Sequence, residues 1–193
     1  MGRLSEWSRH PLANAWQHPY NPAMGGEITT IREAAPGDAP AIARVHEEAW
    51  RATYQGIIPH HHLMRMIARR GPEWWACAAG RAGGLLLLIF DGQVQGYASF
   101  GKARMPYPET GEIFELYLAP TFQGVGFGKR LFLAASRDLE QRGLHSLIVW
   151  ALAENQPACD FYVRLGGKPG ITTPERYGRV TLSRVAFFWP ARP

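Results

Sequence analysis

The chain has 193 residues, of which 46% are hydrophobic and 12% aromatic, a composition typical of one globular domain rather than of a disordered protein. The formal net charge is +5, but the arginines are spread along the chain, whereas a nucleic-acid-binding protein gathers its positive charge in a patch. The longest apolar run, Leu85 to Phe90, is too short to span a membrane. Two cysteines, Cys77 and Cys159, are too few for a disulfide framework. The sequence therefore predicts a cytoplasmic protein without a nucleic-acid or membrane partner.

Residues 1–26 mix tryptophan, proline and polar residues without a clear period. We therefore expect an extended arm, followed by a single domain over residues 27–193. The domain begins with a short strand over 28–32. A turn follows in which Asp38 is a favourable helix N-cap. Apolar residues then repeat at helical spacing as far as Thr53, which predicts the first helix.

The middle of the chain predicts two short helices and a β-hairpin. Residues 56–59 break the first helix, and short helices are expected over 63–68 and 72–79. The apolar run from Leu85 to Phe90 predicts a buried strand. The dipeptide Asp91-Gly92 is preferred in two-residue type I′ turns, so the chain should return as a partner strand over residues 94–100.

Strands and helices alternate in the last part of the chain. The expected elements are a strand over 112–118, a helix over about 128–142, a strand over 147–152, a short helix capped by Asn155 and ending at Leu165, and a strand over 181–189. This order predicts an α/β fold with a single mixed, mostly antiparallel twisted sheet and helices on both faces.

A glycine-rich segment separates the strand over 112–118 from the helix after it. Its glycines stand at alternate positions, Gly124, Gly126 and Gly128, where they let the backbone approach a ligand and turn its N–H groups inward. The helix N-terminus adds partial positive charge, so the segment predicts a pyrophosphate site made of main-chain amides. It fits neither the dinucleotide fingerprint, because Lys129 stands where glycine or alanine is needed, nor a P-loop, because Arg130 replaces serine or threonine.

The pattern Gln-x-x-Gly-x-Gly, here Gln123, Gly126 and Gly128, resembles the coenzyme-binding motif of the GNAT (Gcn5-related N-acetyltransferase) superfamily. The preceding run Glu115–Pro120 and the later segment 155–165, with Phe161-Tyr162 before Leu165-Gly166, resemble neighbouring parts of that family. The resemblance is sharp from Glu112 to Gly167. It implies an acyl-CoA N-acyltransferase fold that binds acetyl-CoA as cosubstrate and needs no metal. The implied reaction is acetyl transfer to a primary amine within a ternary complex.

The resemblance assigns roles to individual residues. Backbone groups of Leu116, Tyr117 and Leu118 would pair with the pantetheine arm, as the edge of a sheet accepts an extended peptide. Asn155 would contact the pantetheine side, and it is also a helix N-cap. The amides that would hold the pyrophosphate belong to Gln123, Gly124, Val125, Gly126, Phe127, Gly128 and Lys129.

The same resemblance points to an acid and a base. Tyr162 matches the tyrosine that protonates the departing sulfur, although it also has the spacing of a packing residue. Glu115 is the expected base, with Glu112 or an ordered water as alternatives. Strand alternation predicts that Glu112 and Glu115 face opposite sides of the sheet.

Two aromatic residues and a histidine run leave alternatives open. Trp50 and Tyr54 are four residues apart on one helix face, where they would either wall an amine pocket or pack against the domain. The run His60-His61-His62 predicts a solvated helix start rather than a metal site, because adjacent helical residues point in different directions.

The acceptor remains open between a small molecule and a peptide amine, and a homodimer is compatible with the sequence. The alternatives to catalysis are a non-catalytic acyl-CoA-binding regulatory module, a nucleotide-binding module and a tight strand–helix turn that binds no ligand.

Overall fold

The computed structural model describes residues 29–80, 83–104 and 109–191, and the predicted arm over 1–26 lies outside them. The strands of these ranges form one sheet in the order β1-β2-β3-β4-β5-β7-β6. They are β1 (Thr29–Glu33), β2 (Gly84–Phe90), β3 (Gln93–Lys102), β4 (Thr110–Leu118), β5 (Ser146–Leu152), β6 (Lys168–Tyr177) and β7 (Val180–Trp189). Only the β4–β5 pair among these strands is parallel, so the predicted mixed, mostly antiparallel sheet is confirmed.

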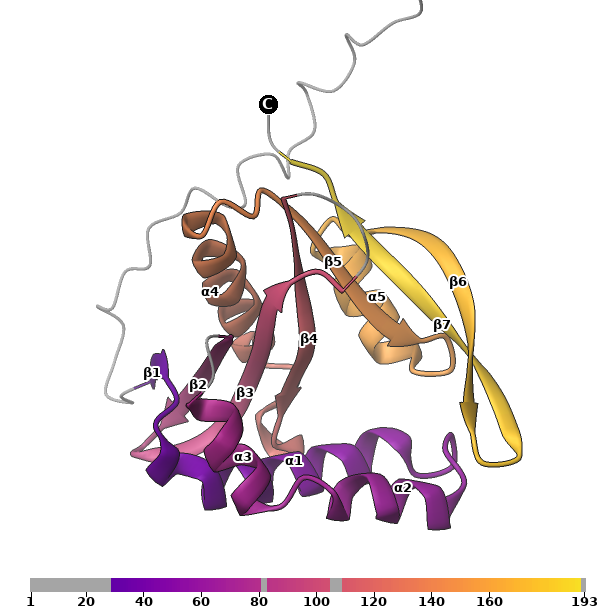
Figure 1. Ribbon diagram of the computed structural model, residues 1–193, viewed down its shortest axis with the longest axis horizontal. Coiled ribbons are helices and arrows are strands. Elements are labelled where there is room, and N and C mark those ends of the chain that lie inside the picture. Colours follow the sequence, from indigo (N-terminus) through magenta and orange to yellow (C-terminus); the bar gives the residue numbers. More distant parts are fainter. Residues whose placement is uncertain (1–28, 81–82, 105–108, 192–193) are drawn as a thin grey trace, which may run out of the picture.

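Helices cover both faces of the sheet, as predicted (Figure 1). They are α1 (Ala39–Tyr54), α2 (His60–Ala68), α3 (Pro72–Ala79), α4 (Phe127–Gln141) and α5 (Gln156–Arg164). The helices α4 and α5 share one apolar core with the sheet, while α1 and α3 build a second core on the other face. None of the helices within the described ranges combines the length and the apolar character needed to cross a membrane.

The start of α1 shows how the sequence directs the chain. Asp38 occupies the predicted N-cap position, but its side chain does not cap the helix. Its carboxylate instead accepts a hydrogen bond from the Ala35 N–H at 2.8 Å and pairs with Arg32. Ile42 and Val45 then bury the apolar face of α1 completely, as the helical spacing predicted.

The predicted hairpin between β2 and β3 is also confirmed. Asp91 and Gly92 both have positive φ, 48° and 73°, which is the conformation that a type I′ turn requires at its two central residues. Every residue from Gly84 to Ile89 is buried, because helices cover both faces of this strand.

One strand escaped prediction. The strand β6 pairs along β7 at the edge of the sheet, yet its sequence contains Pro169, Gly170 and Pro174. Proline cannot donate a ladder hydrogen bond and is tolerated only on edge strands or at bulges. The register of β6 shifts between Pro169 and Thr172. The local sequence therefore argues against a strand here, whereas the position of β6 at the edge of the sheet permits one.

The strand β4 contains a bulge that changes which side chains share a face. Ser99 of β3 pairs with Glu115, while the next residue, Phe100, pairs with Ile113, which leaves Phe114 as an extra residue. Gly101 pairs with Glu112. Because residues 99 and 101 point to the same side of β3, both glutamates lie on the face covered by α1 and α3. The prediction that they face opposite sides was therefore wrong.

The sheet opens between β4 and β5. The two strands pair only through Thr110 to Ile113 of β4 and then separate toward their carboxyl ends (Figure 1). A third apolar cluster lies at this opening. It joins Trp50 and Tyr54 of α1, and residues of α2, to Leu152 of β5 and Tyr177 of β6. This cluster therefore closes the opening between β4 and β5 on the side of α1 and α2.

Candidate active site

The separated half of β4 presents a free backbone edge. Within the described part of the chain, residues 115–118 have ladder partners in β3 only. Their remaining N–H and C=O groups resemble those of an edge strand, which can accept an extended chain that contains amides. Leu116, Tyr117 and Leu118, the predicted pantetheine partners, lie in this half.

The glycine loop lies directly after that edge. Gly124 and Gly126 have φ values of 78° and 92°, which favour glycine, and Gly126 is the N-cap of α4. Within the described residues, the amides of 124–129 donate no backbone hydrogen bond, because the first turn of a helix has no internal acceptors for them. The loop is exposed up to Gly126, and Lys129 is also exposed. This arrangement leaves a row of donors at the positive end of α4.

Two contacts hold the loop in place. The side chain of Gln123 donates from Nε2 to the Leu118 carbonyl oxygen at 3.2 Å, so it fastens the loop to the end of β4. A Cβ at Gly128 would lie 3.3 Å from the Phe161 ring of α5. The motif residues Gln123 and Gly128 therefore have local structural functions as well as their predicted binding roles.

Tyrosines from three elements come together where β4 and β5 separate. The hydroxyls of Tyr54 on α1 and Tyr117 on β4 are 2.6 Å apart. Burial raises the pKa of Tyr54, and hydrogen bonds from Tyr117 and Asn155 oppose that shift. Burial also raises the pKa of Tyr162 on α5, and the neighbouring Tyr54 acts in the same direction. These phenols therefore keep their protons at neutral pH.

Tyr162 combines a fixed ring with an unengaged hydroxyl. Its ring packs among Phe132, Phe161, Phe187 and Trp189, and the residue is 6% exposed. Within the described residues the Tyr162 hydroxyl makes no hydrogen bond to protein. The ring therefore meets the packing interpretation, and its hydroxyl is available for the predicted proton donation. Asn155 accepts from the Ala158 N–H at 3.3 Å, so its N-cap role is confirmed.

Glu115 lies in a network that the sequence did not indicate. Its carboxylate pairs with Arg70, which follows α2, and accepts from the Tyr97 hydroxyl at 3.3 Å. The Tyr97 oxygen also lies 2.8 Å from Nδ1 of His46. The side chain of Glu115 is only 9% exposed. Glu115 is thus a desolvated carboxylate held by two partners from different elements.

The buried His46 supports this network as a neutral ring. It is fully buried, and burial lowers its pKa to about 3. Within the described ranges its Nε2 has no hydrogen-bond partner, and neither do the indole N–H groups of Trp50 and Trp75 in the same cluster. The single proton of the Tyr97 hydroxyl is donated to Glu115, so the Tyr97 oxygen accepts a hydrogen bond from the Nδ1–H of His46. In this tautomer Nε2, which has no partner within the described residues, carries no proton.

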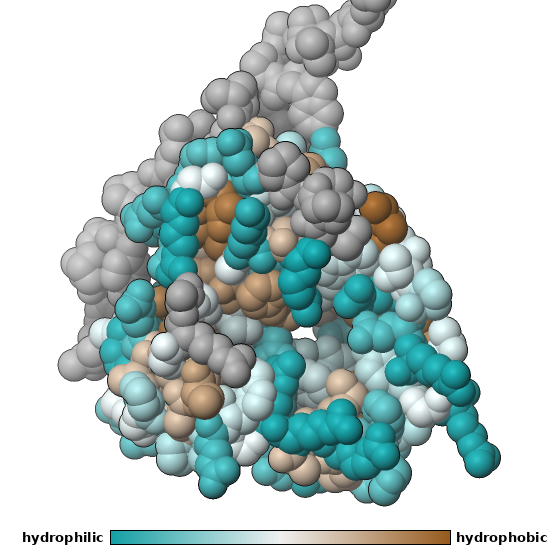
Figure 2. Space-filling view, in the orientation of Figure 1, coloured by the Kyte–Doolittle hydropathy of each residue, from teal (hydrophilic) through white to brown (hydrophobic). Residues whose placement is uncertain are grey.

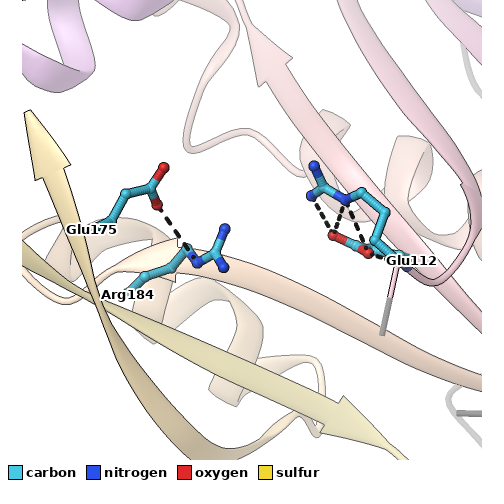
Figure 3. Close-up of polar contacts among 4 residues, drawn as sticks. Glu112, Glu175 and Arg184 are labelled. Carbon is cyan, nitrogen blue, oxygen red and sulfur yellow. Dashed lines mark hydrogen bonds and ion pairs between the residues drawn. The ribbon is translucent and has the colours of Figure 1, made fainter. Parts of the chain in front are cut away.

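Glu112 has a different environment although it shares the same face. It is 1% exposed and accepts from the Arg104 backbone N–H at 3.0 Å and from the Arg104 guanidinium (Figure 3). The Arg104 side chain stacks over the Phe114 ring at 4.9 Å. Glu112 therefore anchors the segment after β3 to β4, and the hydrogen bonds that its carboxylate accepts within the described residues all come from Arg104.

The missed strand β6 brings a further carboxylate to the opening. Glu175 pairs with Arg184 of β7 at 3.5 Å (Figure 3), and Arg184 stacks 4.3 Å over the Trp150 ring. The charge of Glu175 raises the pKa of Tyr177, although burial is the larger cause. Because β6 was not predicted, Glu175 was not recognised as a candidate.

Other predicted residues have structural surroundings. Trp50 and Tyr54 are 7% and 9% exposed and contact each other edge to face. The cation over the Trp50 ring is the Arg70 guanidinium, at 5.7 Å. His60 and His61 are exposed at the start of α2, as expected for a solvated helix start. A role for Trp50 and Tyr54 in acceptor binding stays a prediction.

A sheet that parts between β4 and β5 beside a glycine-rich helix start defines the fold class of the acyl-CoA N-acyltransferases. The chain belongs to the acetyltransferase (GNAT) family, whose pattern matches residues 42–167, and it is an acyltransferase enzyme. Both predictions, of the fold and of the family, are confirmed.

Three similar proteins illustrate the relationship. The chain is 30% identical over 164 residues to the uncharacterized N-acetyltransferase YuaI of Bacillus subtilis (strain 168), which covers 84% of this chain and 94% of that protein. It is 31% identical over 128 residues to the mycothiol acetyltransferase of Arthrobacter sp. (strain FB24), covering 62% of this chain but only 38% of that protein. The PaiA N-acetyltransferase of Thermoplasma acidophilum, solved with coenzyme A, superimposes with a TM-score of 0.71 at 20% identity, over 82% of this chain and 98% of that one.

Proposed function

We propose that this enzyme transfers the acetyl group of acetyl-CoA to a primary amine by direct attack within a ternary complex. The observation that carries the proposal is the free edge of β4 leading into the unpartnered amides at the start of α4. The related structure of PaiA contains coenzyme A, which supports the choice of cosubstrate. Mycothiol acetyltransferase and YuaI support acetyl as the group that is moved.

The residues at the opening fit such a cosubstrate. A Cβ at Gly124 or Gly126 would meet no protein atom within 4 Å, so the loop has open space beside both glycines. The amides of residues 124–129 and the helix dipole would bind that diphosphate. The edge of β4 over Leu116 to Leu118 would bind the amide-containing pantetheine arm, and Asn155 would contact it from α5.

The chain's own groups then supply the proton transfers. A bound thioester supplies an electrophilic carbonyl and a thiolate leaving group. Glu115 accepts a proton from the incoming ammonium, directly or through an ordered water, so that the amine nitrogen becomes nucleophilic. The new C–N bond forms as the C–S bond breaks, and the Tyr162 hydroxyl gives its proton to the departing sulfur. The second proton of the attacking nitrogen, lost as the amide forms, restores the Tyr162 hydroxyl directly or through an ordered water. Arg70 and Tyr97 hold the Glu115 carboxylate in place.

Thiol release from acetyl-CoA, measured over a panel of primary amines, tests the proposal. We expect release only when an amine is present, and we expect Tyr162→Phe to slow it by about 10²-fold or more. Coenzyme binding without thiol release from any amine would favour the alternative, a non-catalytic acyl-CoA-binding module. Stabilisation by ATP or NAD above that by coenzyme A, measured by thermal shift, would favour a nucleotide-binding module. The cytoplasmic location and the homodimer stay predictions.

A further inference from the structure

A cavity of about 340 Å³ lies on the face of the sheet that α1 and α3 cover, within the size range of small-molecule sites. Its wall includes Glu115, the proposed base, so the cavity adjoins the reaction site. The other walls that matter here are two arginines, Arg70 and Arg104, and two aromatic rings, Trp74 and Phe114. Figure 2 shows a hollow on the face that it presents, bordered by both hydrophilic and hydrophobic residues.

Arg70 has N–H donors that Glu115 does not engage, and a second anion nearby would stabilise its positive charge. Only its Nη1 pairs with Glu115, while a guanidinium carries five N–H donors. The guanidinium carbon lies 4.7 Å from the centre of the Trp74 ring and 5.7 Å from that of Trp50. Burial lowers the pKa of Arg70, Tyr97 and Tyr117 raise it, and the neighbouring charge of Arg104 lowers it. An anion between the two arginines would offset the effects of burial and of Arg104.

Arg104 is oriented in a similar way. Its Nε and Nη2 contact Glu112, which leaves Nη1 outside the ion pair, and its guanidinium carbon lies 4.9 Å from the centre of the Phe114 ring. The side chain is 64% exposed. Since Glu112 is 1% exposed and does not line the cavity, the cavity wall carries two positive side chains and one negative side chain.

We propose that this cavity binds the acetyl acceptor and that the acceptor carries a carboxylate as well as its amine, in the manner of an amino acid. The proposal rests on the proposed function and names its substrate class. The carboxylate contacts Arg70 and Arg104, the amine faces Glu115, and an apolar side chain packs against Trp74. A polyamine does not fit, because the lining residues offer no carboxylate besides Glu115 for its second ammonium group.

Matched acceptors test the proposal on the unmodified enzyme. Thiol release is measured with phenylalanine, phenylalaninamide and phenethylamine, and with the corresponding leucine series. We expect kcat/KM for the free carboxylate to exceed that of the other two by at least roughly tenfold, since a charge-assisted hydrogen bond contributes on that order. Equal or better turnover of the amide and the decarboxylated amine would overturn the carboxylate inference and leave the acetyltransferase intact.

A double variant tests the role of Arg104 without leaving Glu112 as an unpaired buried carboxylate. Arg104→Gln combined with Glu112→Gln neutralises both members of the pair, and thermal denaturation checks that the variant is folded. The preference for the carboxylate acceptor should shrink toward parity, mainly through KM. Arg137→Gln, an exposed arginine of α4 on the other face, is the matched control and should keep the preference. An unchanged preference in the folded double variant would also overturn the inference.

Product binding separates failure of the inference from failure of the proposed function. Calorimetry with N-acetylphenylalanine and its amide, in the presence of coenzyme A, reports the carboxylate contact without requiring turnover. Tighter binding of the free acid without thiol release from any amine would support the carboxylate site and refute the acetyltransferase. Equal binding of the two products, with no turnover, would refute both.

Discussion

The two halves of β4 perform different tasks, although they carry similar side chains. The first half, Gly111 to Ile113, pairs with β3 on one side and with β5 on the other, and its Glu112 is held by the Arg104 backbone and guanidinium. The second half pairs only with β3, and its Glu115 is held by single contacts from Arg70 and Tyr97. One bulge at Phe114 separates a structural carboxylate from one that faces a cavity.

The comparison teaches that the opening of the sheet, rather than residue type, decides which glutamate is available for chemistry. Both carboxylates are desolvated, share a face and pair with arginine. Only Glu115 lies where β4 has left β5, next to a space that can admit an acceptor. Substitutions at the two positions should therefore affect different measured quantities.

The largest effect is expected at Glu115. Glu115→Gln keeps the shape of the side chain but removes a proton acceptor, so kcat/KM should fall by about 10²- to 10⁴-fold. Thiol release with the best acceptor measures it, and Glu140→Gln, an exposed residue of α4, is the control. Wild-type turnover in both Glu115→Gln and Tyr162→Phe would refute the proposed acid–base pair.

Glu112 should affect stability instead. Glu112→Ala removes the acceptor of several hydrogen bonds from Arg104 and breaks a pair whose acidic member is buried, at a cost of about 2–4 kcal/mol. Denaturant unfolding measures this cost. The control is Glu47→Ala, which breaks an exposed pair with Arg51 and should cost less than about 1 kcal/mol. Equal costs for the two variants would contradict a structural role for Glu112.

The network behind Glu115 should make stability depend on pH. Since burial lowers the pKa of His46 to about 3 from 6.5, only the unfolded chain binds a proton there between those values. Stability is therefore present above pH 6.5 and falls on acidification, by roughly 1.4 kcal/mol per pH unit at most. His46→Phe should remove about 2 kcal/mol of the loss between pH 7.5 and 5. Unfolding at the two pH values measures this, with the exposed His61→Gln as control; an unchanged slope in His46→Phe would contradict it.

Much of this fold was predictable because its signals are local. Helix and strand periods, the Asp91-Gly92 turn and the glycine loop each follow from a few neighbouring residues, and they correctly placed the hairpin, α4 and the Asn155 cap. The strand β6 was missed because its prolines are permitted only by its place at the sheet edge, which depends on β7.

The site was less predictable because its contacts are distant in sequence. The motif pointed to the glycine loop, and the resemblance pointed to Tyr162 and Glu115 as candidates. Arg70, Tyr97 and His46 belong to three separate elements, and only packing brings them to Glu115. The bulge at Phe114 depends on the register with β3, so no alternation rule could place Glu112 and Glu115 on one face.

The smallest effect is expected from alanine substitutions at the two ends of α4, which distinguish loss of coenzyme A binding from backbone strain. Gly126 at its start and Gly143 after its end have φ values of 92° and 78°, and a Cβ at either would meet no protein atom within 4 Å. Alanine should therefore cost both positions about 1 kcal/mol of stability through backbone strain alone. Only Gly126→Ala should also weaken coenzyme A binding severalfold, measured by calorimetry, because only there does the new methyl group stand beside unpartnered amides. Equal coenzyme affinity in the two variants would mean that the start of α4 does not bind the diphosphate, and the separated edge of β4 would then have no anchor for its ligand.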